Sequence, residues 1–517
     1  MKKKLRYCAL SIFLICCASL LSVYSYGIFA KKAKGLPEYA LPLQPAQTEL
    51  DRLLEPEENK YPGKSGLIFI ENNLEAFAAR ALSAQAAGRS LDLQYYIWHD
   101  DLTGRLLMQE LLSAAKRGVR IRILLDDLTT HNRSSLLAAL NSHPNISVRI
   151  FNPTRSRDRN WRRGLEMVLR FFSVNRRMHN KAWIADGRIA IVGGRNIGDE
   201  YFDADPDINF FDIDLITTGS AVRDASEIFD SYWNSDAVIP MEAFGKPRAD
   251  ALEELEKAAL APRITSDTAP YLGHIHKTAH MEALLARHIP LIWSSDIHIL
   301  ADPPEKAFGT GASGWLIHIL SDHWNKATRS IKIISPYFVP TDSGMQWFQI
   351  FADRGINTSI ITNSLASTDV LAVHGGYAHY RIPLLKLGAN LFEVKRTSPQ
   401  PKTIIASSGA SLHTKAFILD EETAFIGSFN FDPRSTMLNT EMGILFKNPA
   451  IMQLLLKEFA LRSSPAYSYR LKLDKGHLLW EDEQNGKPVI WKQDPHSKWW
   501  QRIYTAFISL LPIETQL

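Results

Sequence analysis

Cysteine is scarce in this 517-residue chain and unevenly placed. All three cysteines, Cys8, Cys16 and Cys17, lie in one apolar segment near the N-terminus. The remainder of the chain therefore has no side chain for a disulfide, a thiolate metal site or a catalytic thiol. The cysteine count leaves both an oxidising and a reducing compartment open.

Acidic residues are missing from residues 1–34, which contain seven lysines and arginines. The formal net charge of the whole chain is +4, so the remaining residues carry 4 − 7 = −3. A negative body excludes an overall nucleic-acid footprint, and we expect no nucleic-acid partner. One basic strip remains, because residues 155–177 hold eight arginines among apolar side chains. It suits either an anionic membrane surface or a solvated helix packed on the first domain.

A long apolar run occupies residues 7–30, with four basic residues before it and three after it. Its length exceeds the roughly 20 residues that span a bilayer. We favour an uncleaved membrane anchor because no small-x-small cleavage site stands out, and a secretory signal peptide is the alternative. Cys16 follows Phe-Leu-Ile, which disfavours lipidation. The heavier basic flank before the run favours a cytoplasmic N-terminus, with the body across the membrane.

The most informative feature is a spaced constellation that occurs twice. Each copy has a histidine, a lysine two residues later and an aspartate five residues after the lysine, followed by a small-residue turn that ends in asparagine. A double match with these extensions is very rare by chance and indicates an internal repeat. The two copies consist of His179, Lys181, Asp186 and Asn196, and of His413, Lys415, Asp420 and Asn430.

The spacing places an imidazole beside an ammonium group. The residues between each lysine and aspartate are apolar and strand-like, and side chains two apart on a strand share one face. Such a pair handles phosphate. If the copies pack about a pseudo-twofold axis, one site receives a nucleophile, a proton donor and a cationic cradle. This chemistry requires no metal and no cofactor.

The repeat extends beyond the motifs and predicts the fold. Residues 91–98 correspond to 331–338, and the strand at 120–125 corresponds to 357–362, with helical periodicity at 104–118. We expect an α/β protein with two pseudo-twofold-related α-β-α sandwich domains, mixed sheets, one shared active site and an N-terminal hydrophobic helix. The expected segments are an anchor or signal segment (1–34), a linker (35–65), domain 1 (66–245), a connector (246–315), domain 2 (316–470) and a C-terminal tail with an amphipathic helix (471–517).

With these motifs the chain resembles the phospholipase D superfamily, from about residue 65 to the C-terminus. Within it, the chain is similar to bacterial cardiolipin synthases of the C type. The subfamily resemblance is carried by residues 91–107, 362–381 and 427–443. Together with the basic flanks, it predicts a bacterial inner-membrane protein whose body faces the periplasm, although the N-terminal extension departs from the usual start of these relatives.

The resemblance also implies roles for individual residues. Acidic residues downstream of each motif would orient the histidines, and Asp212 fits that place in the first copy and Glu441 in the second. The motif lysines and asparagines would bind the phosphate oxygens. His374 and Tyr377 lie where contacts to an acceptor are expected, or they belong to an ordinary loop and helix. Asp186 and Asp420 complete the catalytic motif, but they end a strand at a turn, which favours a structural role.

The activity implied by the resemblance is phosphatidyl transfer through a covalent phosphatidyl-histidine. His179 would attack the phosphodiester and His413 would act as proton donor and then as base. The product would be cardiolipin, made from phosphatidylglycerol and a second phospholipid, with phosphatidylethanolamine as a candidate donor. Membrane phospholipids and the membrane surface are the expected partners. The alternative is a phospholipase D that admits water and releases phosphatidic acid.

Two further patterns have open interpretations. Apolar and aromatic side chains recur at helical spacing in residues 499–511, which fits an interfacial helix or a terminal helix docked on the core. His274, His276 and His280 are spaced like metal ligands, but no carboxylate or thiol accompanies them, so we expect no metal site there.

Overall fold

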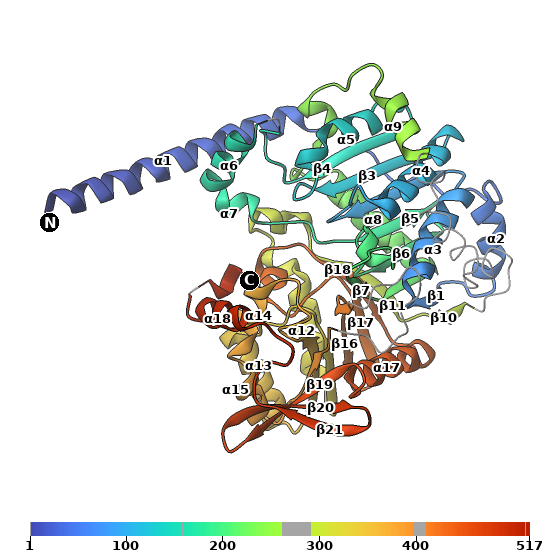
Figure 1. Ribbon diagram of the computed structural model, residues 1–517. Helices are drawn as coiled ribbons and strands as arrows, with labels where there is room; N and C mark the ends of the chain where they lie inside the picture. Colours follow the sequence, from blue (N-terminus) through green and yellow to red (C-terminus); the bar gives the residue numbers. More distant parts are fainter. Residues whose placement is uncertain (1, 158, 261–290, 397–409, 512, 517) are drawn as a thin grey trace.

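The computed structural model describes residues 2–157, 159–260, 291–396, 410–511 and 513–516. Two large sheets organise the chain (Figure 1). The first has nine strands. Helix α4 (Leu102–Lys116) connects two neighbouring parallel strands at the centre of this sheet, as the helical periodicity predicts. In spatial order its strands are β10 (Ile292–Ser294), β1 (Ser65–Ile70), β8 (Asp214–Gly219), β6 (Ile189–Gly193), β5 (Ala182–Ala185), β2 (Ser90–Tyr95), β3 (Arg120–Asp126), β4 (Ile146–Phe151) and β9 (Val238–Pro240).

The second sheet repeats the order of the first. Its strands are β11 (Ile297–Ala301), β18 (Met442–Phe446), β17 (Thr423–Gly427), β16 (Lys415–Leu419), β12 (Ser330–Ile334), β13 (Asn357–Asn363), β14 (Asn390–Val394), β19 (Ser468–Asp474), β20 (His477–Gln484) and β21 (Lys487–Trp491). The run from β11 to β14 matches the run from β1 to β4 strand by strand. In both runs the motif hairpin, β5–β6 or β16–β17, pairs with the first parallel strand. The expected mixed α/β fold with two repeated domains is confirmed.

Helices cover the outer face of each sheet. The outer face of the first sheet packs against α3 (Asn73–Ala86), α4 and α5 (Ser134–Leu140), with α9 (Ala251–Leu260) beyond them. The outer face of the second packs against α12 (Leu316–Lys326), α13 (Thr341–Asp353), α14 (Leu371–Ala378) and α15 (Arg381–Lys386). Helices α8 (Ser220–Trp233) and α17 (Pro449–Ser463) contribute to a third core.

This third core joins the two domains. It contains inward-facing residues of both sheets, such as Ile184 and Val192 of the first and Ile418 and Ile426 of the second. Because alternate side chains of a strand point to opposite faces, each motif hairpin contributes to the core of its own domain and to the shared core. The two motifs are thereby brought to a common interface.

The structure divides the chain differently from the sequence pattern at three places. The expected linker contains α2 (Glu49–Glu58), which begins with a Thr48–Asp51 capping box and buries Leu50, Leu53 and Leu54. The expected connector ends in two sheet strands, with β10 at the edge of the first sheet and β11 at the edge of the second. In the expected tail, β20 and β21 extend the second sheet, and α18 (Trp499–Ile508) follows them. Short strands and one capped helix are too brief for periodicity to identify.

Helix α1 (Lys2–Ala33) projects from the body (Figure 1). Its segment Arg6–Ala33 is long and apolar enough to cross a membrane, and none of its most apolar window is buried against the protein. The N-terminal hydrophobic helix is therefore present as expected.

Candidate active site

Short strands from each domain cross into the other and build the interface. β7 (Asn209–Phe211) of domain 1 pairs in parallel with β15 (Ala410–Leu412) of domain 2, directly before His413. A parallel bridge joins Met178 to Thr440, directly before His179 and Glu441. The backbone N–H of His413 donates to the carbonyl of Phe211, and that of His179 donates to the carbonyl of Thr440, both at 2.8 Å. The pseudo-twofold relation is thus exact enough to repeat individual hydrogen bonds.

Each motif histidine is bonded to a carboxylate of the other domain. Nδ1 of His179 lies 2.8 Å from Oε2 of Glu441, and Nδ1 of His413 lies 2.6 Å from Oδ2 of Asp212. The acidic residues assigned from the sequence are both at the site, but the partnership crosses the domain boundary and does not follow the copies. With the carboxylate accepting from Nδ1–H, each ring leaves Nε2 as its free nitrogen.

Burial and two lysines keep both rings neutral. Burial lowers the pKa of His179 to about 4, and the charges of Lys181 and Lys415 act in the same direction against Glu441. Burial and Lys415 lower the pKa of His413 to about 3. Because the lysine of each domain acts on the histidine of the other, the two histidines and the two lysines belong to one site. A neutral imidazole is the nucleophilic form.

The carboxylates stay ionised although they are fully enclosed. Burial by itself would raise the pKa of Glu441, but His179 and Lys181 hold that pKa below its usual range. Burial acts in the same way on Asp212, whose pKa is held low by His413 and Lys415. Ionised acceptors fix the tautomer of both rings.

The two lysines point back along their own strands toward the site. Nζ of Lys181 donates to the carbonyl of His179 at 2.6 Å, and Nζ of Lys415 donates to the carbonyl of His413. Each ammonium group keeps further N–H donors, since one bond uses one of three. Burial lowers the pKa of Lys415 to about 8. Burial also lowers the pKa of Lys181 well below its usual value. In their protonated forms the two buried lysines are suited to bind an anion.

The two motif asparagines differ in their bonding. Oδ1 of Asn196 accepts from the N–H of Ile97, and its amide donates to the hydroxyl of Tyr201. By contrast, the side-chain oxygen of Asn430 has no hydrogen-bond partner among the described residues, although the side chain is buried. Asn430 is therefore the less constrained of the two phosphate-binding candidates.

The motif aspartates are not at the histidine end of their strands. Asp186 accepts hydrogen bonds from the backbone N–H groups of Gly88, Arg89 and Ser90. Asp420 repeats this arrangement with the N–H groups of residues 328–330. The aspartate follows the histidine by seven positions in each copy, a span of at most roughly 23 Å in an extended chain. These hydrogen bonds assign both aspartates to capping of the turn, which corrects their assignment as catalytic residues. Asp186 and Asp420 both have positive φ angles, 53° and 55°.

Aromatic rings that the motif does not contain flank the histidines. Tyr96 meets His179 edge-on with ring centroids 4.9 Å apart, and Tyr201 meets His413 edge-on at 5.1 Å. Phe210 stacks on His413, also at 5.1 Å, and its ring centroid lies 5.0 Å from that of Tyr201. Tyr96 directly follows β2, the strand that pairs with the motif hairpin, so its position after residues 91–95 is a signal that the sequence offered.

The connector segment (246–315) supports Glu441. Asp302 accepts from the backbone N–H of Glu441 at 2.9 Å, and buried Lys306 bonds both Asp302 and the carbonyl of Ser435. The hydroxyls of Ser428 and Ser435 donate to the Glu441 carboxylate. No sequence signal marked Asp302, because its partners are remote along the chain.

The two acceptor-site candidates lie in a different cluster. Nε2 of His374 is 2.6 Å from Arg381 and 3.7 Å from Asp494, and Tyr377 packs against Phe338 and Arg381. Arg381 also pairs with Glu393 beneath the second sheet. These contacts assign both side chains to the interior of domain 2, which corrects their assignment as acceptor contacts.

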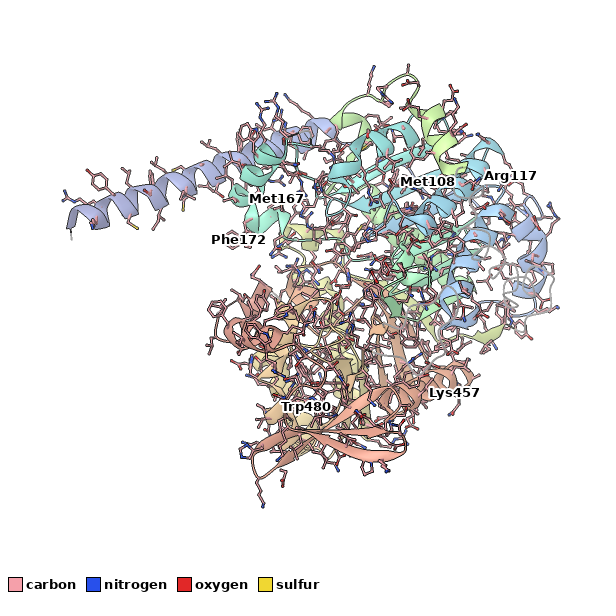
Figure 2. The ribbon with its side chains drawn as sticks, in the orientation of Figure 1. Met108, Arg117, Met167, Phe172, Lys457 and Trp480 are labelled. Carbon is pink, nitrogen blue, oxygen red and sulfur yellow. The ribbon has the colours of Figure 1, made fainter. Side chains whose placement is uncertain are left out.

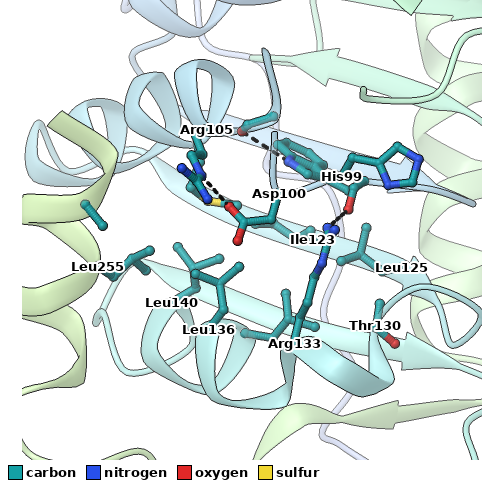
Figure 3. A pocket seen from close by; sticks show the side chains of 15 residues that line it. His99, Asp100, Arg105, Ile123, Leu125, Thr130, Arg133, Leu136, Leu140 and Leu255 are labelled. Carbon is teal, nitrogen blue, oxygen red and sulfur yellow. Dashed lines mark hydrogen bonds and ion pairs between the residues drawn. The ribbon is translucent and has the colours of Figure 1, made fainter. Parts of the chain in front are cut away.

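A separate cavity of about 180 Å³ lies on the outer side of the first sheet, between α4, α5 and α9 (Figure 3). Leucines form its floor, and Arg133 and the Asp100–Arg105 ion pair stand at its rim. None of the motif residues lines it. The histidine triplet at 274–280 lies outside the described residues.

Comparison with known proteins agrees with this geometry. A family model described as "Cardiolipin synthase, PLD-like domain" matches residues 82–233 and 320–462. The chain belongs to this phospholipase D-like cardiolipin synthase family. Cardiolipin synthase C of Escherichia coli (strain K12) is 41% identical over 464 residues, covering 88% of this chain and 97% of that protein. An uncharacterized protein of Helicobacter pylori (strain J99) is 32% identical, covering 97% of this chain and 99% of that protein.

A solved structure supports the fold of this family member. The crystal structure of phosphatidylserine synthase from Haemophilus influenzae Rd KW20 aligns with a TM-score of 0.54 and 14% identity, covering 82% of this chain and 92% of that one. At this identity the similarity concerns the fold. The resemblance to the phospholipase D superfamily is confirmed, and family membership together with the apolar helix α1 indicates membrane association.

Proposed function

We propose that this enzyme transfers a phosphatidyl group between phospholipids and makes cardiolipin. The observation that carries the proposal is the pair of buried imidazoles, one from each domain, each fixed through Nδ1 by a carboxylate of the other domain. Two lysines add positive charge at the same place. This arrangement suits double displacement at an anionic phosphodiester.

In the first step Nε2 of His179 attacks phosphorus. The bond from phosphorus to the head-group oxygen breaks, and His413 gives its proton to that oxygen as the alcohol leaves. The product is a phosphatidyl group bonded to His179, and His413 becomes neutral. Lys181, Lys415 and the Asn430 amide stabilise the non-bridging oxygens, most strongly as charge develops.

His413 takes up its proton from solvent when the substrate binds. The pKa of this ring is held down to about 3 by burial and by the charge of Lys415. A phosphodiester anion placed between the lysines offsets their charge and so raises the pKa of His413. Substrate binding therefore prepares the general acid.

In the second step His413 acts as base. It takes the proton of a glycerol hydroxyl of phosphatidylglycerol, and the oxygen attacks the phosphatidyl group. The bond from phosphorus to His179 breaks, which restores both histidines and releases cardiolipin. The donor is phosphatidylglycerol or phosphatidylethanolamine, with glycerol or ethanolamine as the alcohol released. One phosphodiester replaces another, so the transfer needs no cofactor.

The basic flanks of α1 support a proposal for the side of the membrane on which the body lies. Four basic residues before the apolar run and three after it favour a cytoplasmic N-terminus. We propose that α1 anchors the protein in a bacterial inner membrane with its body in the periplasm. Fusion of a periplasm-dependent reporter to residue 517 would be active, and a cytoplasm-dependent reporter would be inactive; the reverse result would contradict this orientation.

The decisive experiment gives the purified enzyme labelled phosphatidylglycerol, with and without phosphatidylethanolamine. Labelled cardiolipin supports the proposal, and phosphatidic acid as the only product overturns it in favour of a phospholipase D. His179→Ala and His413→Ala should each abolish turnover. His298→Ala is the matched control, because that histidine is exposed on β11. A chelator should leave the rate unchanged.

A further inference from the structure

The helices that precede His179 expose an apolar surface. α6 (Asn160–Leu169) buries none of its side chains, and α7 (Phe171–Val174) follows it directly. Trp161 is 65% exposed, Val168 70% and Phe172 84%. Figure 2 shows Phe172 at the outer edge of the body, on the side from which α1 projects. Such a cluster of exposed large apolar side chains is typical of an interaction site.

α6 lies against the membrane-span candidate α1. The guanidinium of Arg170 covers the ring of Tyr26, and that of Arg155 lies 5.2 Å from the centroid of Phe29. Ser19 of α1 donates to the carbonyl of Leu169. These contacts extend from Ser19, near the middle of the apolar run, to Phe29 near its end, so α6 lies beside the body-proximal half of α1 and would enter the interfacial region of a bilayer that α1 crosses.

A second apolar surface comes from the other domain. α18 exposes Trp499, Ile503 and Phe507, which are between 58% and 69% accessible, and buries Thr505 and Ile508 toward domain 2. In Figure 1 α18 lies on the same side of the molecule as α6 and α7. Tryptophan at one end and aliphatic side chains along one face are typical of helices that lie in a membrane interface.

Hydrogen bonds connect the two surfaces. Asn175, the residue after α7, donates its amide to the side chain of Gln516, which follows α18. Arg434 of α16 (Pro433–Met437) donates to the side chain and carbonyl of Asn175 and to the carbonyl of Gln516. The two patches therefore lie on either side of this hydrogen-bonded junction, and we call them together the docking face: Trp161, Val168, Phe172, Trp499, Ile503 and Phe507.

The docking face continues directly into the active site. The chain reaches His179 five residues after α7 ends at Val174. Along this segment Arg176 donates to the carbonyl of Met437, and the carbonyl of Arg177 accepts from Thr440, the neighbour of Glu441. The strand that carries the nucleophile and the loop that carries its orienting carboxylate thus both leave from this face.

Most arginines of the basic strip (residues 155–177) interact with other residues of the protein. Arg157 pairs with Asp127, Arg170 with Glu166, and Arg177 lies 3.6 Å from Asp126. Arg159 and Arg162 remain exposed at the start of α6, beside Trp161. The positive charge available to bind a membrane is therefore small. It is confined to the start of α6, next to Trp161.

We propose that the docking face lies on the bilayer that α1 enters, with its apolar side chains at head-group depth and Arg159 and Arg162 on anionic head groups. This inference rests on the proposed function, in which both substrates are bilayer lipids, and adds the surface through which they reach the site. The occupant is a lipid surface because the face is continuous with a helix able to cross one.

The test places a nitroxide label at the docking face in the full chain. Cys8, Cys16 and Cys17 are replaced by serine, and one cysteine is introduced as Phe172→Cys or Phe507→Cys. Ile490→Cys is the matched control, because this exposed residue of β21 lies on the second sheet's far edge. In vesicles containing phosphatidylglycerol, collisions with apolar oxygen should exceed those with a water-soluble nickel complex at residues 172 and 507 but not at 490.

Three outcomes would overturn the proposal. Labels at 172 and 507 as accessible to nickel as the label at 490 would place the face in water. Labels hidden from both reagents would show a protein partner, and a lipid signal at only one position would show that the two patches do not act together. The measurement needs no product, so it stands apart from a failure of the transferase assay.

A second measurement tests the supply of substrate. For the double variant Phe172→Ser and Phe507→Ser, the rate on vesicles relative to the rate on dissolved short-chain phosphatidylglycerol should fall about tenfold. An unchanged ratio would contradict the role of the face in substrate entry.

Discussion

Glu441 of the second domain accepts a hydrogen bond from Nδ1 of His179 of the first domain, at 2.8 Å. Asp212 of the first domain likewise accepts a hydrogen bond from Nδ1 of His413 of the second domain. Each half of the repeat therefore lacks a complete histidine–carboxylate pair, and assembly of the two domains is a condition for catalysis. The first prediction tests this dependence.

Glu441→Gln and Asp212→Asn should each lower kcat by about 10²- to 10⁴-fold, because loss of the ionised acceptor leaves the ring free to adopt the wrong tautomer. Kinetics with labelled phosphatidylglycerol measure the loss. Glu458→Gln is the control, since this carboxylate is also buried but lies on α17 beside Arg462. Wild-type rates in both site variants would remove the orienting role.

The turn aspartates should affect stability more than chemistry. Asp186→Ala leaves the N–H groups of residues 88–90 without acceptors, at a cost of about 1–3 kcal/mol in the free energy of unfolding. Asp420→Ala should cost less, because Asp420 is partly exposed whereas Asp186 is fully buried. Denaturant titration measures both values. A variant of normal stability with no turnover would show that the aspartates act in catalysis.

The rate should fall in alkaline solution as Lys415 loses its proton. Burial lowers its pKa to about 8, so the ammonium group is charged below this pH and neutral above it. Loss of the charge removes stabilisation of the phosphate, and kcat/KM should therefore decline as pH rises through about 8. Lys415→Arg keeps the charge at every accessible pH. If the variant shows the same alkaline decline, the titrating group is not Lys415.

The two asparagines should separate stability from activity. Asn430→Ala removes no hydrogen bond of its side-chain oxygen, so the melting temperature should be nearly unchanged while kcat falls about 10²-fold through loss of a donor to the phosphate. Asn196→Ala frees the N–H of Ile97 and the hydroxyl of Tyr201, and should cost about 1–3 kcal/mol of stability. Equal stability losses in both variants would contradict the structural difference.

The repeat made much of this protein predictable. Because a strand alternates its side chains, the spacing of His179 and Lys181 indicated a shared surface, and the matching segments around it indicated paired parallel strands joined by a helix. The strand β3 and the helix α4 begin and end within two residues of their expected limits. The family resemblance supplied the two carboxylates, which local pattern alone did not mark.

Other features of the structure could not be predicted from a pattern in the sequence. The helix α2 is short, and β10 and β11 consist of three and five residues, too few to show a period. Asp302 and Lys306 support Glu441 from more than a hundred residues away. His374 and Tyr377 lie in a segment whose sequence resembles that of the relatives, but their side chains contact Arg381.

By itself the sequence determined which groups exist: two imidazoles, two ammonium groups, their strands and an apolar helix before them. These follow from residue identity and from periods of two to four residues, which act within one element. Only the tertiary structure decided which carboxylate serves which histidine and which aspartates merely cap a turn. Those pairings depend on how two sheets bury a common apolar core, and such packing joins residues with no fixed separation along the chain.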